Sequence, residues 1–164
     1  MHTPLEFIVR LIKLATDRRV ESSALLSPCR ELRELELVVR RPGNWEAEII
    51  SSITSLSIRK VTLAYRLLIP GSSARAVNWG AFDEPFCRLV DRLGSTHELE
   101  VEILIVDKRG MSTHRDIDSG MIVSSLTAFR EKGRIRLAYV DRDGGKYVVY
   151  PLDPCSPNPP ASVC

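Results

Sequence analysis

The sequence predicts an α/β fold in which helices cover one face of a mostly parallel sheet, as an open array of degenerate helix and strand repeats. Helix-like and strand-like segments alternate, the strand-like runs alternate apolar with polar residues, and the runs recur at separations of 26, 38 and 36 residues. A parallel sheet covered on both faces should instead have nearly continuous apolar strands. An α+β sandwich with antiparallel pairing is the alternative fold.

The first helix is expected over residues 3–15. Thr3 can cap this helix, Pro4 suits its first turn and Glu6 completes a capping box. The apolar residues that recur at helical spacing are Leu5, Ile8, Val9, Ile12 and Ala15.

The second helix should follow Pro42-Gly43-Asn44, with Asn44 as its cap, and end near Ser55. Its apolar face would carry Trp45, Ile49 and Ile53.

The third helix should begin at Asp83 as its cap, with Pro85 in the first turn, and end at Gly94. A fourth, weaker helical pattern carries Ile122, Leu126 and Phe129 and ends at Gly133.

Four strand-like runs each follow a helix: Leu35–Val39, Val61–Tyr65, Leu99–Ile103 and Ile135–Tyr139. Because their side chains alternate, one face of the sheet should be apolar and the other wet. The side chains expected on the wet face include Glu36, Thr62, Glu100, Glu102 and Arg136.

The two ends of the array differ. The turn-forming run Asp141–Gly145 and the β-favouring run Lys146–Leu152 predict an antiparallel hairpin that closes the last strand. At the other end we expect no earlier strand to pair with Leu35–Val39, which leaves an exposed edge. Residues 1–152 then form a single leucine-rich-repeat-like domain, and residues 153–164 form a flexible, proline-rich tail.

Composition narrows the function classes. With 23 Lys and Arg against 21 Asp and Glu, the net charge is +2 and the two signs are interleaved, which argues against nucleic-acid binding. The apolar start is interrupted by charges and too short to span a membrane. The widely spaced cysteines indicate reduced thiols in the cytoplasm or nucleus; they are Cys29, Cys87, Cys155 and Cys164.

Catalytic and metal-binding motifs are weak. His114-Arg115-Asp116 spells a kinase catalytic loop, but Met121 stands where that loop needs Asn. Asp141-x-Asp143-Gly144 resembles a calcium loop, yet it fits a hairpin turn better. We therefore expect no enzyme activity, metal or cofactor. A hydrolytic site assembled from scattered residues, including His97 or His114, remains a less favoured alternative.

The pattern L-x-x-L-x-L of leucine-rich repeats fits Leu32, Leu35 and Leu37. Over residues 20–150, the chain resembles the leucine-rich-repeat-like C-terminal half of fungal F-box-like proteins. The segments that carry this resemblance are Leu26–Leu35, Arg41–Glu46, Phe82–Asp91 and Phe129–Gly133. The resemblance implies a substrate-recognition role in ubiquitin ligation. It implies binding to a Skp-type adaptor only if an F-box lies upstream, because the residues after Pro4 do not continue as one.

These observations predict a non-catalytic module that binds another protein through the wet strand face. The proposed binding side chains are Glu36, Thr62, Glu100, Glu102, Arg134 and Arg136, with Trp79 as an exposed aromatic anchor. An orphan or truncated structural fragment without a specific partner is the alternative.

Overall fold

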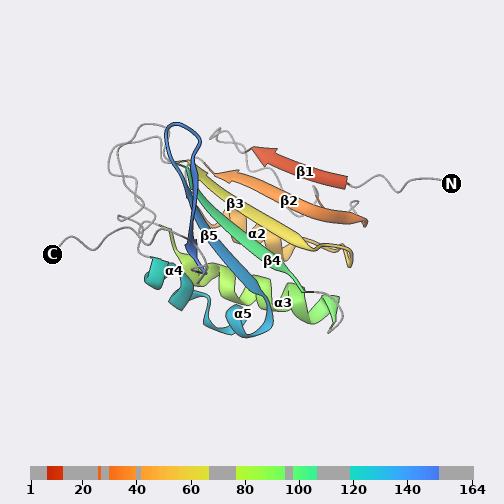
Figure 1. The fold of residues 1–164 in the computed structure, drawn as a ribbon. Helices are drawn as coiled ribbons and strands as arrows, with labels where there is room; N and C mark the ends of the chain where they lie inside the picture. Colours follow the sequence, from red (N-terminus) through yellow and green to blue (C-terminus); the bar gives the residue numbers. More distant parts are fainter. Residues whose placement is uncertain are drawn as a thin grey trace.

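The computed structural model describes residues 7–12, 26, 30–39, 42–66, 77–94, 98–106 and 119–151, with backbone alone for 7–12. These residues contain one six-stranded sheet whose strand order follows the chain (Figure 1). The strands are β1 Phe7–Ile12, β2 Leu32–Val39, β3 Lys60–Arg66, β4 Glu100–Val106, β5 Arg134–Val140 and β6 Lys146–Tyr150.

Strands β1 to β5 pair in parallel, and β6 pairs with β5 in the antiparallel sense. The prediction of an α/β fold with a mostly parallel sheet is thus confirmed, and the antiparallel sandwich is wrong. The hairpin expected at the end of the array is confirmed as well. Residues 153–164, for which we predicted a tail, lie outside the described residues.

The predicted first helix is wrong where the structure describes it, because Phe7–Ile12 forms strand β1. This strand pairs with β2, so the prediction that Leu35–Val39 has no earlier partner is also wrong. The residues carry a double pattern. Ile8, Val9 and Ile12 match helical spacing, but they are β-branched and favour strands, and pairing with β2 satisfies the backbone groups of β1 that point towards β2.

Core side chains of neighbouring strands are aligned in rows. Leu35, Val61, Val101 and Ile135 lie side by side in one row, and Leu37, Leu63, Ile103 and Leu137 lie in the next. All eight are buried. Because Val101 rather than Leu99 aligns with Val61, the separations from Leu35 through Val61 and Val101 to Ile135 are 26, 40 and 34.

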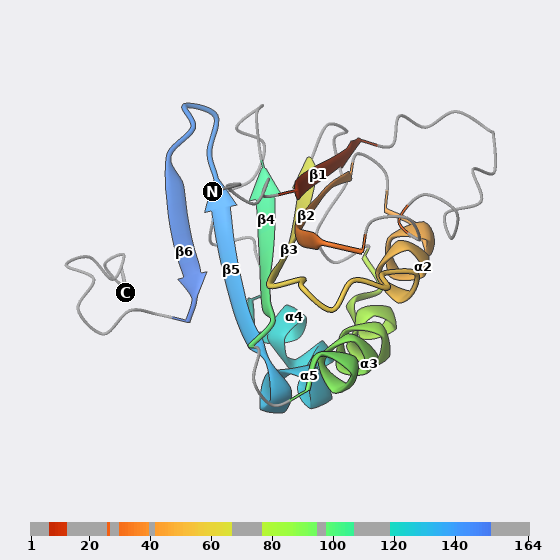
Figure 2. The same cartoon turned by 90° about the vertical axis from the view of Figure 1, so that its right-hand side faces the viewer.

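The described helices lie on one side of the sheet, as Figure 2 shows. They are α2 Trp45–Ser51, the 3-10 helix η2 Trp79–Phe82, α3 Asp83–Leu93, α4 Ser119–Ser125 and α5 Thr127–Lys132. Aromatic rings join this layer to β3, with centroids 5.1 to 6.1 Å apart along the series Tyr65, Trp79, Phe82, Phe86 and Phe129. The core therefore lies between the helices and one sheet face.

The fourth predicted helix is divided in two at Leu126, whose backbone leaves the helical region with φ −108° and ψ 44°. Hydroxyl groups next to this residue bind backbone carbonyls of the preceding turn. Ser125 donates to Met121 O at 2.8 Å and Thr127 to Ser124 O at 2.7 Å. Such bonds compete with regular helix geometry and favour an interruption here. The apolar spacing does not register them, so it predicted one continuous helix.

Candidate binding surface on the helix-free face

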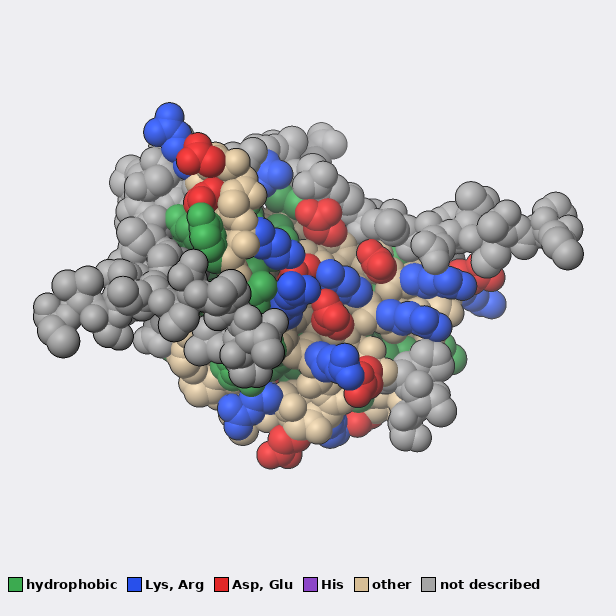
Figure 3. Space-filling model, viewed as in Figure 1, with side chains coloured by type: hydrophobic (Ala, Val, Ile, Leu, Met, Phe, Trp, Pro, Cys, Tyr) green, Lys and Arg blue, Asp and Glu red, His purple; other side chains and the backbone are tan. Residues whose placement is uncertain are grey.

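Two rows of polar residues cross the sheet on the face opposite the helices. Parallel register places Glu34, Lys60, Glu100 and Arg134 in the first row, and Glu36, Thr62, Glu102 and Arg136 in the second. We call these eight residues the polar rows. Since alternate residues of a strand point to the same face, the side chains of both rows point away from the apolar core. Figure 3 shows the mixture of basic and acidic side chains on this face.

Six of the seven predicted binding residues belong to the polar rows: Glu36, Thr62, Glu100, Glu102, Arg134 and Arg136. Arg134 and Arg136 are exposed, and Glu36, Thr62 and Glu100 are partly exposed. These six residues therefore share one face, as the alternation predicted. Their role in binding remains a prediction.

Glu102 differs from the other five, because only 3% of its surface is exposed. It was expected on a wet face, and that expectation is wrong for this residue. A carboxylate is buried at such a position only when cations or hydrogen-bond donors compensate the lost hydration.

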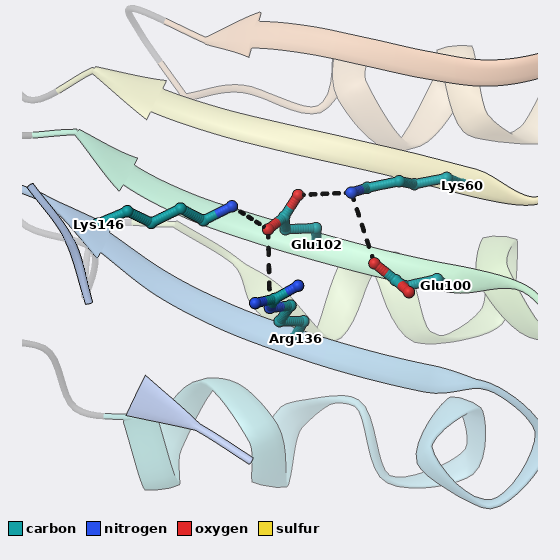
Figure 4. Close-up of polar contacts among 5 residues, drawn as sticks. All are labelled: Lys60, Glu100, Glu102, Arg136 and Lys146. Atoms are coloured by element: carbon teal, nitrogen blue, oxygen red, sulfur yellow. Dashed lines mark hydrogen bonds and ion pairs between the residues drawn. The ribbon is translucent and has the colours of Figure 1, made fainter. Parts of the chain in front are cut away.

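Three cations from three strands supply that compensation, as Figure 4 shows. The Lys60 Nζ lies 2.8 Å from Glu102 Oε2, and the Lys146 Nζ donates to Oε1 at 2.5 Å. The Arg136 Nε lies 3.9 Å from Oε1, an ion-pair distance. Lys60 also lies 3.5 Å from Glu100. We call Lys60, Glu102, Arg136 and Lys146 the Glu102 cluster.

The ionisation of this cluster follows from its geometry. Burial favours the neutral acid, but hydrogen bonds and charges from Lys146 and Lys60 outweigh it and lower the pKa of Glu102. Burial likewise opposes the charge of Lys60, but Glu102 and Glu100 together raise the pKa of Lys60. Both groups are therefore ionised at neutral pH.

Lys60 and Lys146 were missing from the sequence prediction, although both belong to the Glu102 cluster. Lys60 directly precedes the run Val61–Tyr65, and strand alternation extended by one residue would have placed it on the same face as Thr62; the register of β3 and β4 then sets it beside Glu100. Lys146 reaches the cluster through the β5–β6 hairpin. The position of Lys146 depends on the register of that hairpin, and no pattern in the sequence predicted this register.

Trp79 does not join this surface. The sequence placed it in a loop as an exposed anchor, whereas the structure leaves only 2% of it exposed, in η2. Its ring lies 5.1 Å from the Tyr65 ring, on the helix side of the sheet. The prediction of an exposed aromatic anchor is therefore wrong, because the loop folds Trp79 into the aromatic series of the core.

The helix-free face becomes apolar towards the ends of the strands. The next row contains Val38, Ala64, Leu104 and Ala138. Val38, Ala64 and Ala138 are buried, and Leu104 is half-buried. The prediction of a wet face is thus confirmed for the polar rows, with Glu102 excepted, and is wrong for this row.

The loop that resembled a calcium site is a hairpin turn, as the sequence favoured. Asp141 Oδ1 accepts the N–H groups of Asp143 at 3.0 Å and Gly145 at 2.6 Å. The Tyr147 hydroxyl donates to Asp141 Oδ2 at 3.1 Å. The Asp141 carboxylate is thus occupied by the turn itself. In the described ranges, no three His, Cys, Asp or Glu side chains gather as a metal site.

The other chemical candidates occupy separate places. His2, His97, His114, Cys29, Cys155 and Cys164 lie outside the described residues. Cys87 is a free thiol on α3, and burial followed by the charge of Asp83 raises its pKa. A raised pKa keeps this sulfur in the thiol form, which is the poorer nucleophile.

No family model matches the chain, and no match is found among curated proteins or solved structures. Among the helices that the structure describes, none combines the length and the apolar character needed to cross a bilayer.

Proposed function

We propose that the chain is a non-catalytic protein-binding module whose contact surface is the polar rows on the helix-free face. The observation that carries this proposal is the register of those rows, which aligns charged side chains of four adjacent strands on a face that the described helices leave open. A mostly parallel sheet normally has both faces covered. A charged half-face that the described helices leave open is therefore a candidate for contact with a partner.

Rigid placement of the side chains supports the proposal. The polar rows stand on strands whose other face is packed in the core, so their spacing is fixed by the sheet rather than by a flexible loop. Binding on such a scaffold therefore costs little backbone conformational entropy. Charge pattern would then select and orient the partner more than it sets affinity.

The proposal includes a degenerate leucine-rich-repeat-like array. Regular stacking supports it, because backbone hydrogen bonds also join successive strand entrances. Arg59 N donates to Arg33 O at 2.8 Å, Glu100 N to Arg59 O at 2.8 Å, and Arg134 N to Leu99 O at 2.9 Å. Stacked units of this kind bury a shared core and present a continuous surface.

From the resemblance of the sequence to the C-terminal half of fungal F-box-like proteins, we propose a substrate-recognition role of the F-box type, in the cytoplasm or nucleus. Attachment to a Skp-type adaptor belongs to this proposal only if an F-box accompanies the repeats.

Site-specific photo-crosslinking tests the binding surface. A photoreactive amino acid would replace Thr62 in the polar rows or, as the matched control, Arg88 on the exposed side of α3. We expect one protein from a lysate of the source cells to crosslink at position 62 and not at 88. Equal crosslinking from both positions, or none from position 62, would contradict the proposal.

A further inference from the structure

We infer that the Glu102 cluster and the neighbouring Arg134 form a docking surface for an extended acidic peptide segment. This inference rests on the proposed function and names the chemistry of the partner. Opposite charges in the cluster are unequally exposed.

The cluster is layered, with its anion beneath its cations. The Glu102 side chain is 4% exposed, whereas those of Lys60, Arg136 and Lys146 are 31%, 45% and 42% exposed. Three positive charges thus surround one buried negative charge. Glu100 adds a second negative charge, next to Lys60. An approaching partner therefore meets mainly cations over β5 and β6.

Among the described residues, Lys146 and Arg136 keep donors for a second anion. A lysine ammonium has three N–H donors, and Lys146 uses one of them on Glu102. Arg136 has five donors and approaches Glu102 only at 3.9 Å. Charge-assisted hydrogen bonds to an incoming carboxylate can form on the solvent side without displacing Glu102.

Strand spacing specifies an extended ligand. Arg134 and Arg136 are separated by one residue of β5, so their side chains leave the same face about 6.6 Å apart. An extended peptide repeats its side chains at the same interval. Acidic residues at alternate peptide positions would therefore match both arginines.

Arg134 is available for such a contact. Its guanidinium lies 2.6 Å from Glu98, but the two side chains are 69% and 66% exposed. An exposed pair of this kind contributes little, so a partner carboxylate can replace Glu98 at small cost.

Peptide binding measured by fluorescence anisotropy tests the inference. The probe is a labelled peptide with glutamates at alternate positions, and the comparison peptide has the same composition with its glutamates adjacent. We expect the alternating peptide to bind more tightly at about 0.1 M salt, where long-range attraction is screened. The Arg136→Gln variant should bind the alternating peptide about tenfold more weakly.

Arg88→Gln is the matched control, because it removes the same charge from an exposed position on α3. It should leave binding of the alternating peptide unchanged. Urea unfolding of each variant shows whether it is folded, and Arg134→Gln gives the same binding test if Arg136→Gln is unfolded.

Three results would overturn the inference: equal weakening by Arg88→Gln, no binding of the alternating peptide, or equally tight binding of a single-stranded oligonucleotide. The crosslinking experiment separates this failure from that of the proposed function. A partner captured at position 62 together with no peptide binding would show that the face binds a protein of different chemistry.

Discussion

The carboxylate of Asp83, at the start of α3, accepts the backbone N–H of Phe129 in α5 at 2.8 Å. Its second oxygen accepts the N–H of Ala128 at 3.2 Å. Leu126 occupies the cap position of α5 and has no side-chain oxygen to bind these groups. Asp83 was predicted to cap its own helix, but in the structure it caps a neighbouring one.

Replacing Asp83 with alanine should therefore destabilise the fold. We expect Asp83→Ala to lower the free energy of unfolding by about 1.5 kcal/mol, because two N–H groups at the start of α5 lose their acceptor. Urea unfolding would measure this. The control is Asp91→Ala, which removes an exposed ion pair with Lys132 and should cost less than about 0.5 kcal/mol. Equal costs for both variants would contradict the capping role.

Gly133 lies where a larger residue has no room. A Cβ at this position would lie 2.4 Å from Phe129 Cε2 and 3.1 Å from the Leu99 carbonyl oxygen. Because Phe129 is fully buried, its ring cannot move aside freely. Gly133→Ala should lower the free energy of unfolding by about 2 kcal/mol in urea unfolding. Gly80→Ala should cost clearly less, since its Cβ would meet its nearest atom at 3.7 Å.

Neutralising Glu102 should destabilise the protein at neutral pH. In Glu102→Gln the cations Lys60, Arg136 and Lys146 lose their shared counter-ion and repel one another. We expect a loss of about 2 kcal/mol at pH 7, less than for a fully buried pair because the cations are partly exposed. An unchanged urea midpoint would show that the cluster contributes nothing to stability.

The pH dependence of stability should report the same cluster. Because the folded pKa of Glu102 lies below its ordinary value of 4.5, its contribution is complete above pH 4.5 and is lost as the pH falls through the folded pKa. Wild-type protein should therefore lose more stability than Glu102→Gln between pH 7 and about pH 3. The contribution of Lys60 to stability has the opposite pH dependence, because its folded pKa lies above its ordinary value of 10.5. That contribution is complete below pH 10.5 and is lost as the pH rises through the folded pKa. Urea midpoints across the pH range would test both.

Removing the hydroxyl of Tyr65 should stabilise the protein, in contrast to the substitutions above. This hydroxyl is buried, and within the described part of the chain no hydrogen-bond partner lies within reach. Burial, and then the charge of Glu46, raises the pKa of Tyr65, so the group is neutral. Tyr65→Phe removes a buried hydroxyl that has no partner among the described residues, and it keeps the ring contact with Trp79. It should raise the free energy of unfolding by about 1 kcal/mol. A lower thermal midpoint would indicate a partner for the hydroxyl in the folded protein.

The strands were predictable where alternation was unambiguous. Leu37, Leu63 and Leu137 alternate with polar or small residues, and all three are buried in the core. In Phe7–Ile12 the same residues satisfied both helical spacing and strand preference, and capping residues ahead of them favoured the wrong choice. Pairing with β2 decides between the two, and such a tertiary effect is invisible in a local pattern.

The candidate surface was predictable to a similar extent. Alternation assigns a face to each residue, so it placed Glu100 and Arg136 correctly. It does not measure burial, which depends on what neighbouring strands contribute, and for this reason Glu102 was taken for a wet residue. The position of Trp79 depends on how a loop folds, and neither helical spacing nor strand alternation predicts the fold of a loop.

A sheet whose strand order follows the chain has a consequence for how the protein is made. Each strand from β2 to β6 pairs with the strand that precedes it, so its partner has already left the ribosome when it emerges. From β2 to β6, no strand must therefore wait for a later segment before one of its edges is paired, which shortens the time that bare edges are open to aggregation.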